Sequence, residues 1–321
     1  MAIIFKDGFC FFELSNKHIS LIMDKRIDNI IEYVNLNNIE SLTIQPNLHD
    51  VISEKNVQEC LLSKISEVGF LEQMPSLSEI RLIDVEQCDI KGIYFLNKLK
   101  KLTITNSQNN PNKNVIVEFN RFSKLEELNV DWFSNGFDIS ENTELKTLLI
   151  RKFWPKCGDF SVMRLPNKLS KMEIVQSNIQ NLMGIHSDTL ESLELSFCTR
   201  LTSLRGINAI SRQLNKIIVD SATHLSDYTE INHCQALQSI VFVQCGDMMS
   251  LDWVGSLPNL SHLVLDKTTV TNGEMRNILN IDRVFFTNKK YYNCKCVVSP
   301  NNGNWRYKVV EKNKTNTILT W

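Results

Sequence analysis

One short apolar pattern recurs along most of this chain and limits what it can fold into. It is Leu-x-x-Leu-x-Leu, with Ile, Val, Met or Phe as substitutes, and after a longer first gap its copies start 20 to 26 residues apart. A period of this size means that each copy is one supersecondary unit, which buries its apolar face only by stacking on its neighbours. The pattern therefore predicts a solenoid of about eleven repeats, each with one strand. The copies start at Ile39, Leu77, Leu99, Leu125, Leu145, Leu169, Leu190, Leu214, Leu237, Leu260 and Ile281.

Two of the copies extend the pattern beyond the strand. Residues 190–207 and 237–254 match each other position for position, with apolar residues and one cysteine in the same places. They resemble the leucine-rich repeat family, L-x-x-L-x-L-x-x-N/C-x-L, and the copy at 169–185 is similar to the repeats of bacterial internalins. The resemblance covers residues 39–288. It implies an α/β leucine-rich repeat solenoid, in which a curved parallel β-sheet lines the concave face.

The sequence on either side of the repeats predicts two caps. In the N-terminal cap, residues 1–38, an Asp-Gly pair between two apolar runs is a strong hairpin signal, and apolar residues over 27–34 are spaced for one face of a helix. A similar spacing near 54–72 predicts a helical insertion that accounts for the long first gap. The C-terminal cap, residues 289–321, has the pattern of a closing β-hairpin.

The composition indicates a chain that buries a core. Of the 321 residues 43% are hydrophobic, and the formal charge of -1 gives no general attraction to nucleic acid or to a membrane. The nine cysteines are an odd number at irregular spacings, which suits a reducing compartment better than a disulfide framework. The first residues lack the basic start and the apolar core of a signal peptide, and no apolar run reaches the length of about 18 residues that a membrane span needs. We therefore expect a cytoplasmic protein.

The residues between the apolar strand positions are predicted to face outward, because side chains along a strand alternate between its two faces. In four consecutive repeats near the C-terminal end this outward position is apolar, and another apolar residue lies beside it. Such a continuous apolar patch on the concave face marks a partner site. Strand propensity and coverage by the C-terminal cap stay open as alternatives, because β-branched residues are favoured on any strand and the cap can fold over the patch. The patch consists of Ile218, Val241, Val243, Val264 and Phe285.

A second candidate for partner binding lies in the middle repeats. Trp132, Arg151, Trp154 and Phe197 follow strands at the edge of the concave face. Trp and Arg are among the residue types that most often contribute energy to protein interfaces. The alternative is a register shifted by one residue, which would place Trp132 and Trp154 in the core instead.

The sequence shows no constellation of residues with catalytic or metal-binding spacing. Its six histidines are scattered, and it has no glycine-rich phosphate loop. Cys294 and Cys296 lack the second pair that a zinc site needs. We predict no enzyme activity, no cofactor and no metal. Basic and aromatic residues mix over 289–314, a pattern that fits single-stranded nucleic acid, an acidic protein partner or, as we favour, a guard against strand-to-strand aggregation.

Three functions from different classes fit this sequence. The one we favour is a bacterial immunity or antitoxin-like protein in the cytoplasm, which sequesters a partner toxin on its concave face by steric occlusion. This hypothesis rests on analogy, since a scaffold without an effector domain acts by binding alone. The second is an adaptor or regulatory subunit that positions a signalling enzyme. The third is an enzyme, which we disfavour because no acid, base and nucleophile converge.

Overall fold

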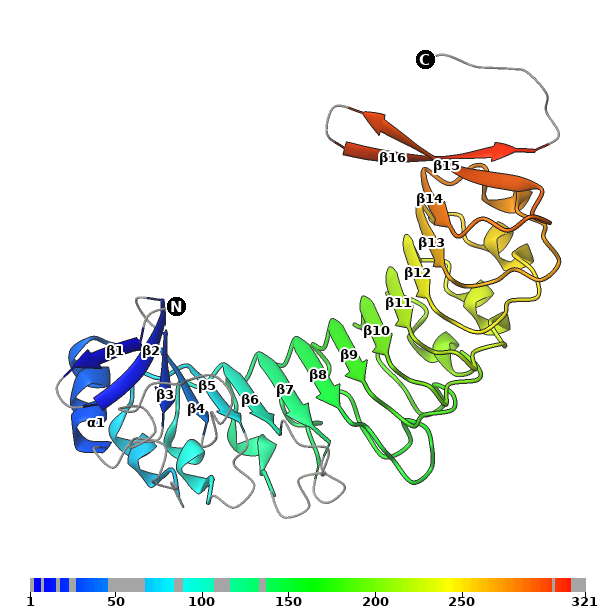
Figure 1. The fold of residues 1–321 in the computed structure, drawn as a ribbon. Coiled ribbons are helices and arrows are strands. Elements are labelled where there is room, and N and C mark those ends of the chain that lie inside the picture. The colour runs from blue at the N-terminus through cyan, green and yellow to red at the C-terminus, as the bar shows by residue number, and fades with distance from the viewer. Residues whose placement is uncertain are drawn as a thin grey trace. The chain divides into compact units, whose positions relative to one another are not determined.

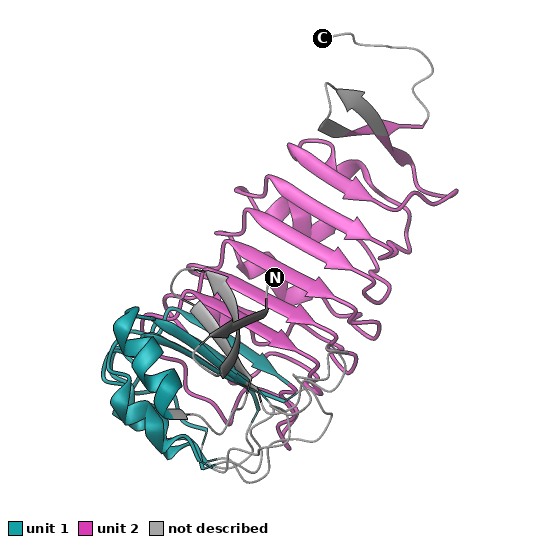
Figure 2. Cartoon of the chain, turned by 60° about the vertical axis from the view of Figure 1, so that its left-hand side comes forward, with its two compact units in different colours: residues 1–151 teal, residues 152–321 magenta. Residues whose placement is uncertain are grey.

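The protein is built from short strands joined by turns and 3₁₀ helices. The computed structural model describes residues 3–6, 9–15, 18–22, 27–45, 67–83, 89–106, 116–132, 137–301 and 304–312. They form two compact units, unit 1 over residues 1–151 and unit 2 over residues 152–321, which Figure 2 colours separately. Within each unit the strands follow one another side by side in chain order (Figure 1). In the described part of the chain, no helix is long and apolar enough to cross a membrane.

Unit 1 begins with an antiparallel hairpin that leads into a parallel stack. Strands β1 (Ile3–Lys6) and β2 (Phe9–Ser15) pair antiparallel, which confirms the predicted hairpin, although its Asp-Gly pair lies outside the described residues. Strand β3 (His18–Ile22), which we did not predict, pairs antiparallel with β2 and parallel with β4 (Ser41–Gln45). The sheet therefore changes from antiparallel to parallel at β3.

The predicted helix of the N-terminal cap is confirmed. The part of the predicted helical insertion that the structure describes is not an α-helix. Helix α1 (Ile27–Leu36) buries apolar residues of one face, including Ile30 and Val34. Of the insertion expected at 54–72, residues 54–66 lie outside the described residues. Its C-terminal end is not an α-helix: Glu67 forms an isolated bridge with Asp89, and the 3₁₀ helix η1 (Gly69–Gln73) follows.

The parallel strands of unit 1 stack in register, so that equivalent residues of successive repeats lie next to each other. Leu102 of one repeat pairs with Ile80 before it and Leu128 after it, and all three side chains are buried. The repeat pattern thus becomes a ladder of apolar side chains on the inner face of the sheet. The elements of this stack are β5 (Glu79–Ile83), η2 (Lys91–Phe95), β6 (Lys101–Thr105), η3 (Phe119–Arg121), β7 (Glu127–Asp131) and β8 (Thr147–Arg151).

Unit 2 continues the same design through six parallel strands. Leu193, Ile217, Ile240 and Leu263 are in register and fully buried. Both units therefore have leucine-rich repeat architecture. The elements here are β9 (Lys171–Val175), β10 (Ser192–Ser196), η4 (Ile207–Ile210), β11 (Lys216–Asp220), η5 (Thr229–His233), β12 (Ser239–Val243), η6 (Asp252–Ser256), β13 (His262–Asp266), η7 (Arg276–Ile278) and β14 (Arg283–Phe286).

A residue with left-handed backbone follows most strands of unit 2. Its N–H still donates to the next repeat, as from Phe197 to the carbonyl of Asp220 at 2.9 Å, so the ladder extends one residue beyond the strand before the chain turns. None of these residues is glycine, the usual occupant of this region of backbone space. The stacked repeats therefore impose the conformation. After β9 to β13 these residues are Gln176, Phe197, Ser221, Gln244 and Lys267, with φ between 50° and 59°, and Lys152 after β8 of unit 1 is similar, with φ 56°.

The C-terminal cap is a β-hairpin, as predicted. Strands β15 (Cys294–Asn301) and β16 (Asn304–Glu311) pair antiparallel and form a two-stranded sheet of their own. The side chain of Asn288 attaches β15 to the last repeat, because its amide both donates to the carbonyl of Cys296 (2.9 Å) and accepts from the N–H of Cys296 (2.8 Å).

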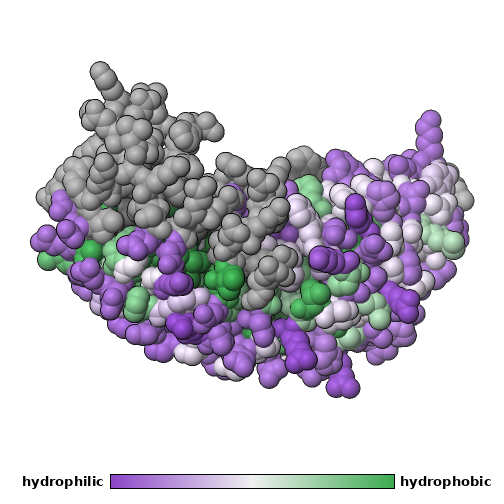
Figure 3. All heavy atoms as spheres, turned by 90° about the horizontal axis from the view of Figure 1, so that it is seen from below, coloured by the Kyte–Doolittle hydropathy of each residue, from purple (hydrophilic) through white to green (hydrophobic). Residues whose placement is uncertain are grey.

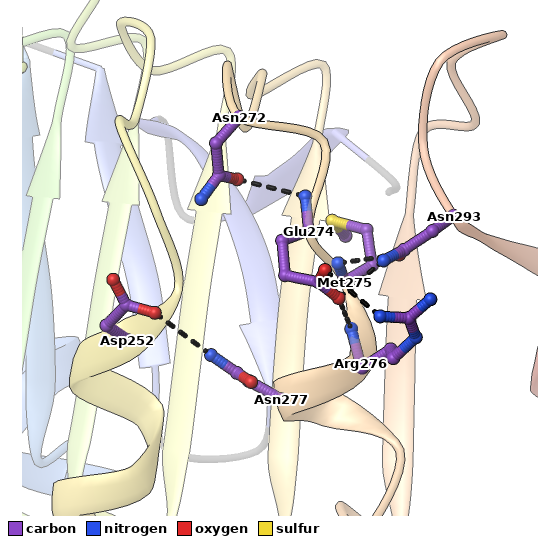
Figure 4. Close-up of polar contacts among 7 residues, drawn as sticks. All are labelled: Asp252, Asn272, Glu274, Met275, Arg276, Asn277 and Asn293. Carbon is purple, nitrogen blue, oxygen red and sulfur yellow. Dashed lines mark hydrogen bonds and ion pairs between the residues drawn. The ribbon is translucent and has the colours of Figure 1, made fainter.

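A polar network at the start of β15 strengthens this attachment (Figure 4). Asn293 accepts a hydrogen bond from the N–H of Met275 at 2.8 Å and donates one to the carboxylate of Glu274. Glu274 in turn accepts from the N–H of Arg276 at 3.1 Å. The hydrogen bond from Asn293 lowers the pKa of Glu274, so this carboxylate stays charged at neutral pH. The hairpin is thus held against the turn that contains η7.

Candidate protein-binding face

Four apolar side chains form a row on the solvent-facing side of the unit 2 sheet. Ile218 pairs with Val241, Val241 with Val264, and Val264 with Phe285, so they are neighbours across β11 to β14. Each of the four is partly exposed. The residues directly before and after each of them in its strand are buried, as Ile240 and Phe242 are on either side of Val241. The outward alternation predicted from the sequence is confirmed for these four residues, which we call the apolar row.

The fifth predicted residue of the patch lies in a different row. Val243 pairs with Asp220 on one side and with Asp266 on the other. Both carboxylates accept a hydrogen bond from a hydroxyl group, Asp220 from Ser221 at 2.9 Å and Asp266 from Thr287 at 2.8 Å. Val243 is therefore an apolar interruption in an acidic row that runs along one flank of the apolar row.

A basic row, which we did not predict, runs along the other flank. Lys216, Ser239, His262 and Arg283 pair in that order across β11 to β14. Within the part of the chain that the structure describes, neither Lys216 nor Arg283 forms an ion pair. The sequence contains the information needed to predict this row, because these residues hold the same position in successive repeats. They are about 23 residues apart in the chain, however, so they do not stand out as a basic cluster in the linear sequence.

Burial and the two neighbouring positive charges act on the imidazole of His262. Burial lowers its pKa below the ordinary value of 6.5, and the positive charges of Arg283 and Lys216 lower it further. Its ring nitrogen Nδ1 lies 3.4 Å from the hydroxyl of Ser239. At neutral pH the ring is uncharged, and the row carries the positive charges of Lys216 and Arg283.

This lowered pKa predicts a loss of stability in mild acid. As the pH falls below about 7, the unfolded chain binds a proton at His262 before the folded chain does, so the free energy of unfolding decreases until the lower folded-state pKa is reached. His262→Gln removes that contribution. Urea unfolding at pH 7.5 and 5.5 should show a smaller loss on acidification for the variant than for the wild type. An equal or larger loss in the variant would refute the assignment.

The apolar row ends in a hollow of about 640 Å³ beside the C-terminal hairpin. Val264 and Phe285 of the row line it, and so does Tyr307 of β16. The rings of Phe285 and Tyr307 meet edge to face, with centroids 5.0 Å apart. The cap therefore contacts the end of the apolar row, and its contact makes a wall of the hollow. The described residues that line it are His262, Val264, Asp282, Arg283, Val284, Phe285 and Tyr307.

The apolar row stops abruptly at its N-terminal side. The same outward position is occupied by Glu173 in β9 and by Glu194 in β10, which are paired neighbours. Burial raises the pKa of Glu173, and the adjacent charge of Glu194 raises it further. Because identical strand positions carry carboxylates in two repeats and apolar groups in the next four, strand propensity alone does not account for the row.

The residues predicted in the middle repeats have different environments. In unit 1, Trp132 is buried with its ring 5.0 Å from that of Phe137, so its predicted outward position is wrong. Val130 is buried as the repeat requires, so the register itself is not shifted, and the ring of Phe137 packs near that of Trp132. Arg151 is partly exposed, and its guanidinium Nε donates to the buried carboxylate of Asp131 at 2.8 Å.

The two predicted aromatic residues of unit 2 are exposed. Trp154 is 43% and Phe197 53% accessible, and the adjacent Phe153 is fully buried, so the alternative that places Trp154 in the core is excluded. Phe197 also has the left-handed backbone described above. Exposure of this kind is what the binding prediction requires, and the prediction itself stays open for these two residues.

The cysteines predicted to be structural are buried. Cys198 and Cys245 lie at equivalent positions, and burial raises the pKa of each thiol to about 12. Cys294 and Cys296, which we did not expect to hold zinc, are also buried. Over the described ranges no group of three or more His, Cys, Asp or Glu side chains is placed to hold a metal ion.

Figure 3 shows one face of the molecule, with the described residues coloured by hydropathy. Hydrophilic residues predominate on it, and hydrophobic residues lie among them in small groups. Scattered apolar residues are normal on protein surfaces, whereas an aligned row of four is typical of a surface that contacts a partner.

Comparisons with known proteins find similar folds and no family assignment. No protein-family profile matches the chain, and no curated protein does. Internalin C2 from Listeria monocytogenes is 16% identical, with a TM-score of 0.37, over 68% of this chain and 83% of that one. The functional domain of InlJ from Listeria monocytogenes, which includes a cysteine ladder, is 13% identical, with a TM-score of 0.27, over 68% of this chain and 65% of that one.

A leucine-rich repeat protein from Leptospira interrogans is 13% identical to the chain. Its TM-score is 0.32, over 84% of this chain and 83% of that one. The repeats of the sequence and the in-register parallel strands of both units give this chain leucine-rich repeat architecture.

Proposed function

We propose that the chain is a protein-binding scaffold whose partner contacts the solvent-facing side of β11 to β14. The apolar row carries this proposal, because four adjacent apolar side chains stay partly exposed where the preceding repeats have carboxylates. An apolar strip between charged rows has the composition of a protein interface, with a water-excluding centre and a polar rim. Parallel strands also hold these side chains in fixed positions, which lowers the entropic cost of binding.

Within this class we propose that the protein sequesters its partner by steric occlusion, as an immunity or antitoxin-like protein does to a toxin domain. The support is that such a role needs only a rigid face that covers the partner's own working surface. A cytoplasmic location is part of the proposal, because an odd number of cysteines suits a reducing compartment.

The test is affinity capture from cells of the source organism with two baits, the full wild-type chain and the full chain with Val264→Asp. The proposal predicts a stoichiometric protein that only the wild type retains. The activity of that protein is then measured with and without an equimolar amount of the chain. Sequestration predicts that activity is lost on binding, whereas activity that survives in the complex would indicate an adaptor. Capture of the same proteins by both baits would contradict partner binding at the apolar row.

A further inference from the structure

The charges and the hollow at the end of the apolar row indicate the chemistry of the segment that binds there. We propose that the hollow takes a large apolar side chain, preferably aromatic, from an acidic segment of a protein partner, and that carboxylates of the same segment pair with Lys216 and Arg283. This inference rests on the proposed function and specifies the partner that the same face selects.

The first argument is the positive charge of the basic row. Adjacent strands in a sheet lie about 4.8 Å apart, so Lys216, His262 and Arg283 stand along one line within reach of a single short segment. Within the described ranges no carboxylate pairs with Lys216 or Arg283. A negatively charged segment would therefore gain attraction without breaking an ion pair among the described residues.

The second argument is the asymmetry between the two flanks. On the acidic flank, Asp220 and Asp266 already accept hydrogen bonds from hydroxyl groups of Ser221 and Thr287. On the opposite flank, Lys216 and Arg283 have no carboxylate partner among the described residues. This difference orients the bound segment, with its carboxylates on the side of the basic row and its apolar side chains over Val241 and Val264.

The third argument is the hollow itself. Its volume of about 640 Å³ accommodates a large side chain with its neighbouring backbone, and Val264, Phe285 and Tyr307 supply apolar and aromatic walls. Aromatic side chains prefer edge-to-face contacts such as the one between Phe285 and Tyr307, which an inserted ring extends. The hydrogen bonds of Asn288 and Asn293 hold the hairpin, so the wall at Tyr307 is in place before binding.

A nucleic acid also carries negative charge, but the surroundings of the hollow favour a peptide. Asp282 lines the hollow together with Arg283, and Asp266 lies on the far side of the apolar row. A chain of phosphates would bring repeated negative charge close to these carboxylates, whereas a peptide places its few acidic side chains only where the cations are.

The experiment measures binding of four fluorescent probes to the full chain by anisotropy at low salt. The probes are the acidic peptide GSDEWEDSG, the basic peptide GSKKWKKSG, the peptide GSDEGEDSG without its tryptophan, and a single-stranded deoxythymidine decamer. The acidic tryptophan peptide should bind at least about tenfold more tightly than each of the others, and added salt should weaken its binding. Arg283→Glu should lower the affinity for the acidic tryptophan peptide by about tenfold or more, because it reverses the charge beside the hollow.

Arg212→Glu is the matched control, since Arg212 is an exposed arginine of the same unit that lies outside the sheet face. It should leave the affinity unchanged. Circular dichroism of both variants checks that they are folded. Phe285→Ala is a second variant, which does not change the charge and should also lower the affinity for the acidic tryptophan peptide. Equal binding of the peptides, absence of measurable binding, tighter binding of the oligonucleotide or equal effects of Arg283→Glu and Arg212→Glu would each overturn the inference. If these results occur while Val264→Asp still loses the captured partner, only the partner's chemistry is wrong and the proposed function stands.

Discussion

Replacing Val241 and Val264 together with Asp is expected to weaken binding of the native partner by more than about 100-fold, because two adjacent contacts at the centre of the interface would each cost about 2 kcal/mol or more. The two side chains are neighbours in the apolar row and both are partly exposed. Introduced carboxylates would have to lose water against an apolar partner surface. The measurement is the dissociation constant of the purified complex by isothermal calorimetry.

The stability of the variant must be measured in parallel, since Asp is unfavourable in strands by up to about 1 kcal/mol per site. Thr103→Asp is the matched control, because Thr103 holds the same outward position in β6 of unit 1 and is also partly exposed. It should lower the free energy of unfolding by about half as much as the double variant, because only one site is changed, and should not affect binding. If the double variant binds the partner as tightly as the wild type does, the apolar row is not part of the interface.

Phe242→Ala is expected to lower the free energy of unfolding by about 3 to 5 kcal/mol, the usual cost of removing a buried phenylalanine ring. Phe242 is fully buried in β12, and its ring centroid lies 5.2 Å from that of Tyr228 in an edge contact. Each repeat rests on its neighbours, so the cavity would affect the repeats on both sides. The adjacent Val241 points to the opposite face, and Val241→Ala should cost about 1 kcal/mol or less.

Urea unfolding of the two variants, monitored by circular dichroism, measures this difference between consecutive residues. Binding should show the reverse order when it is measured under conditions where both variants are folded. Val241→Ala should lower the affinity for the partner, and Phe242→Ala should leave this affinity nearly unchanged. Similar losses of stability in the two variants would contradict the assignment of Phe242 to the core and of Val241 to the surface.

The repeat allowed much of the fold to be predicted from the sequence. A period-two apolar pattern determines which face of a strand is buried, so Leu193, Ile217 and Ile240 could be assigned to the core without coordinates. The same alternation gave the outward positions of Ile218 and Val241. The N-terminal helix and both hairpins also carried strong local signals, a helical spacing in one case and turn residues in the others.

What the sequence did not predict depends on contacts between segments that lie far apart in the chain or on small local choices. Trp132 is buried, and its ring packs near that of Phe137 at 5.0 Å, a contact that the repeat pattern does not encode. The basic row exists only when the register of β11 to β14 brings Lys216, His262 and Arg283 into line. Likewise, the contact of Tyr307 with Phe285 depends on how the hairpin is attached, and no periodic pattern encodes it.

The central claim is that the partner lies against the sheet face of unit 2, and photocrosslinking tests it most directly. A photoreactive phenylalanine analogue is placed at Val264, in the apolar row, or at Met249, an exposed residue in the turn between β12 and η6. After irradiation of the complex, mass spectrometry measures which position is joined to the partner. We expect a crosslinked partner from position 264 and none from position 249. A partner crosslinked from position 249 and not from position 264 would contradict the account.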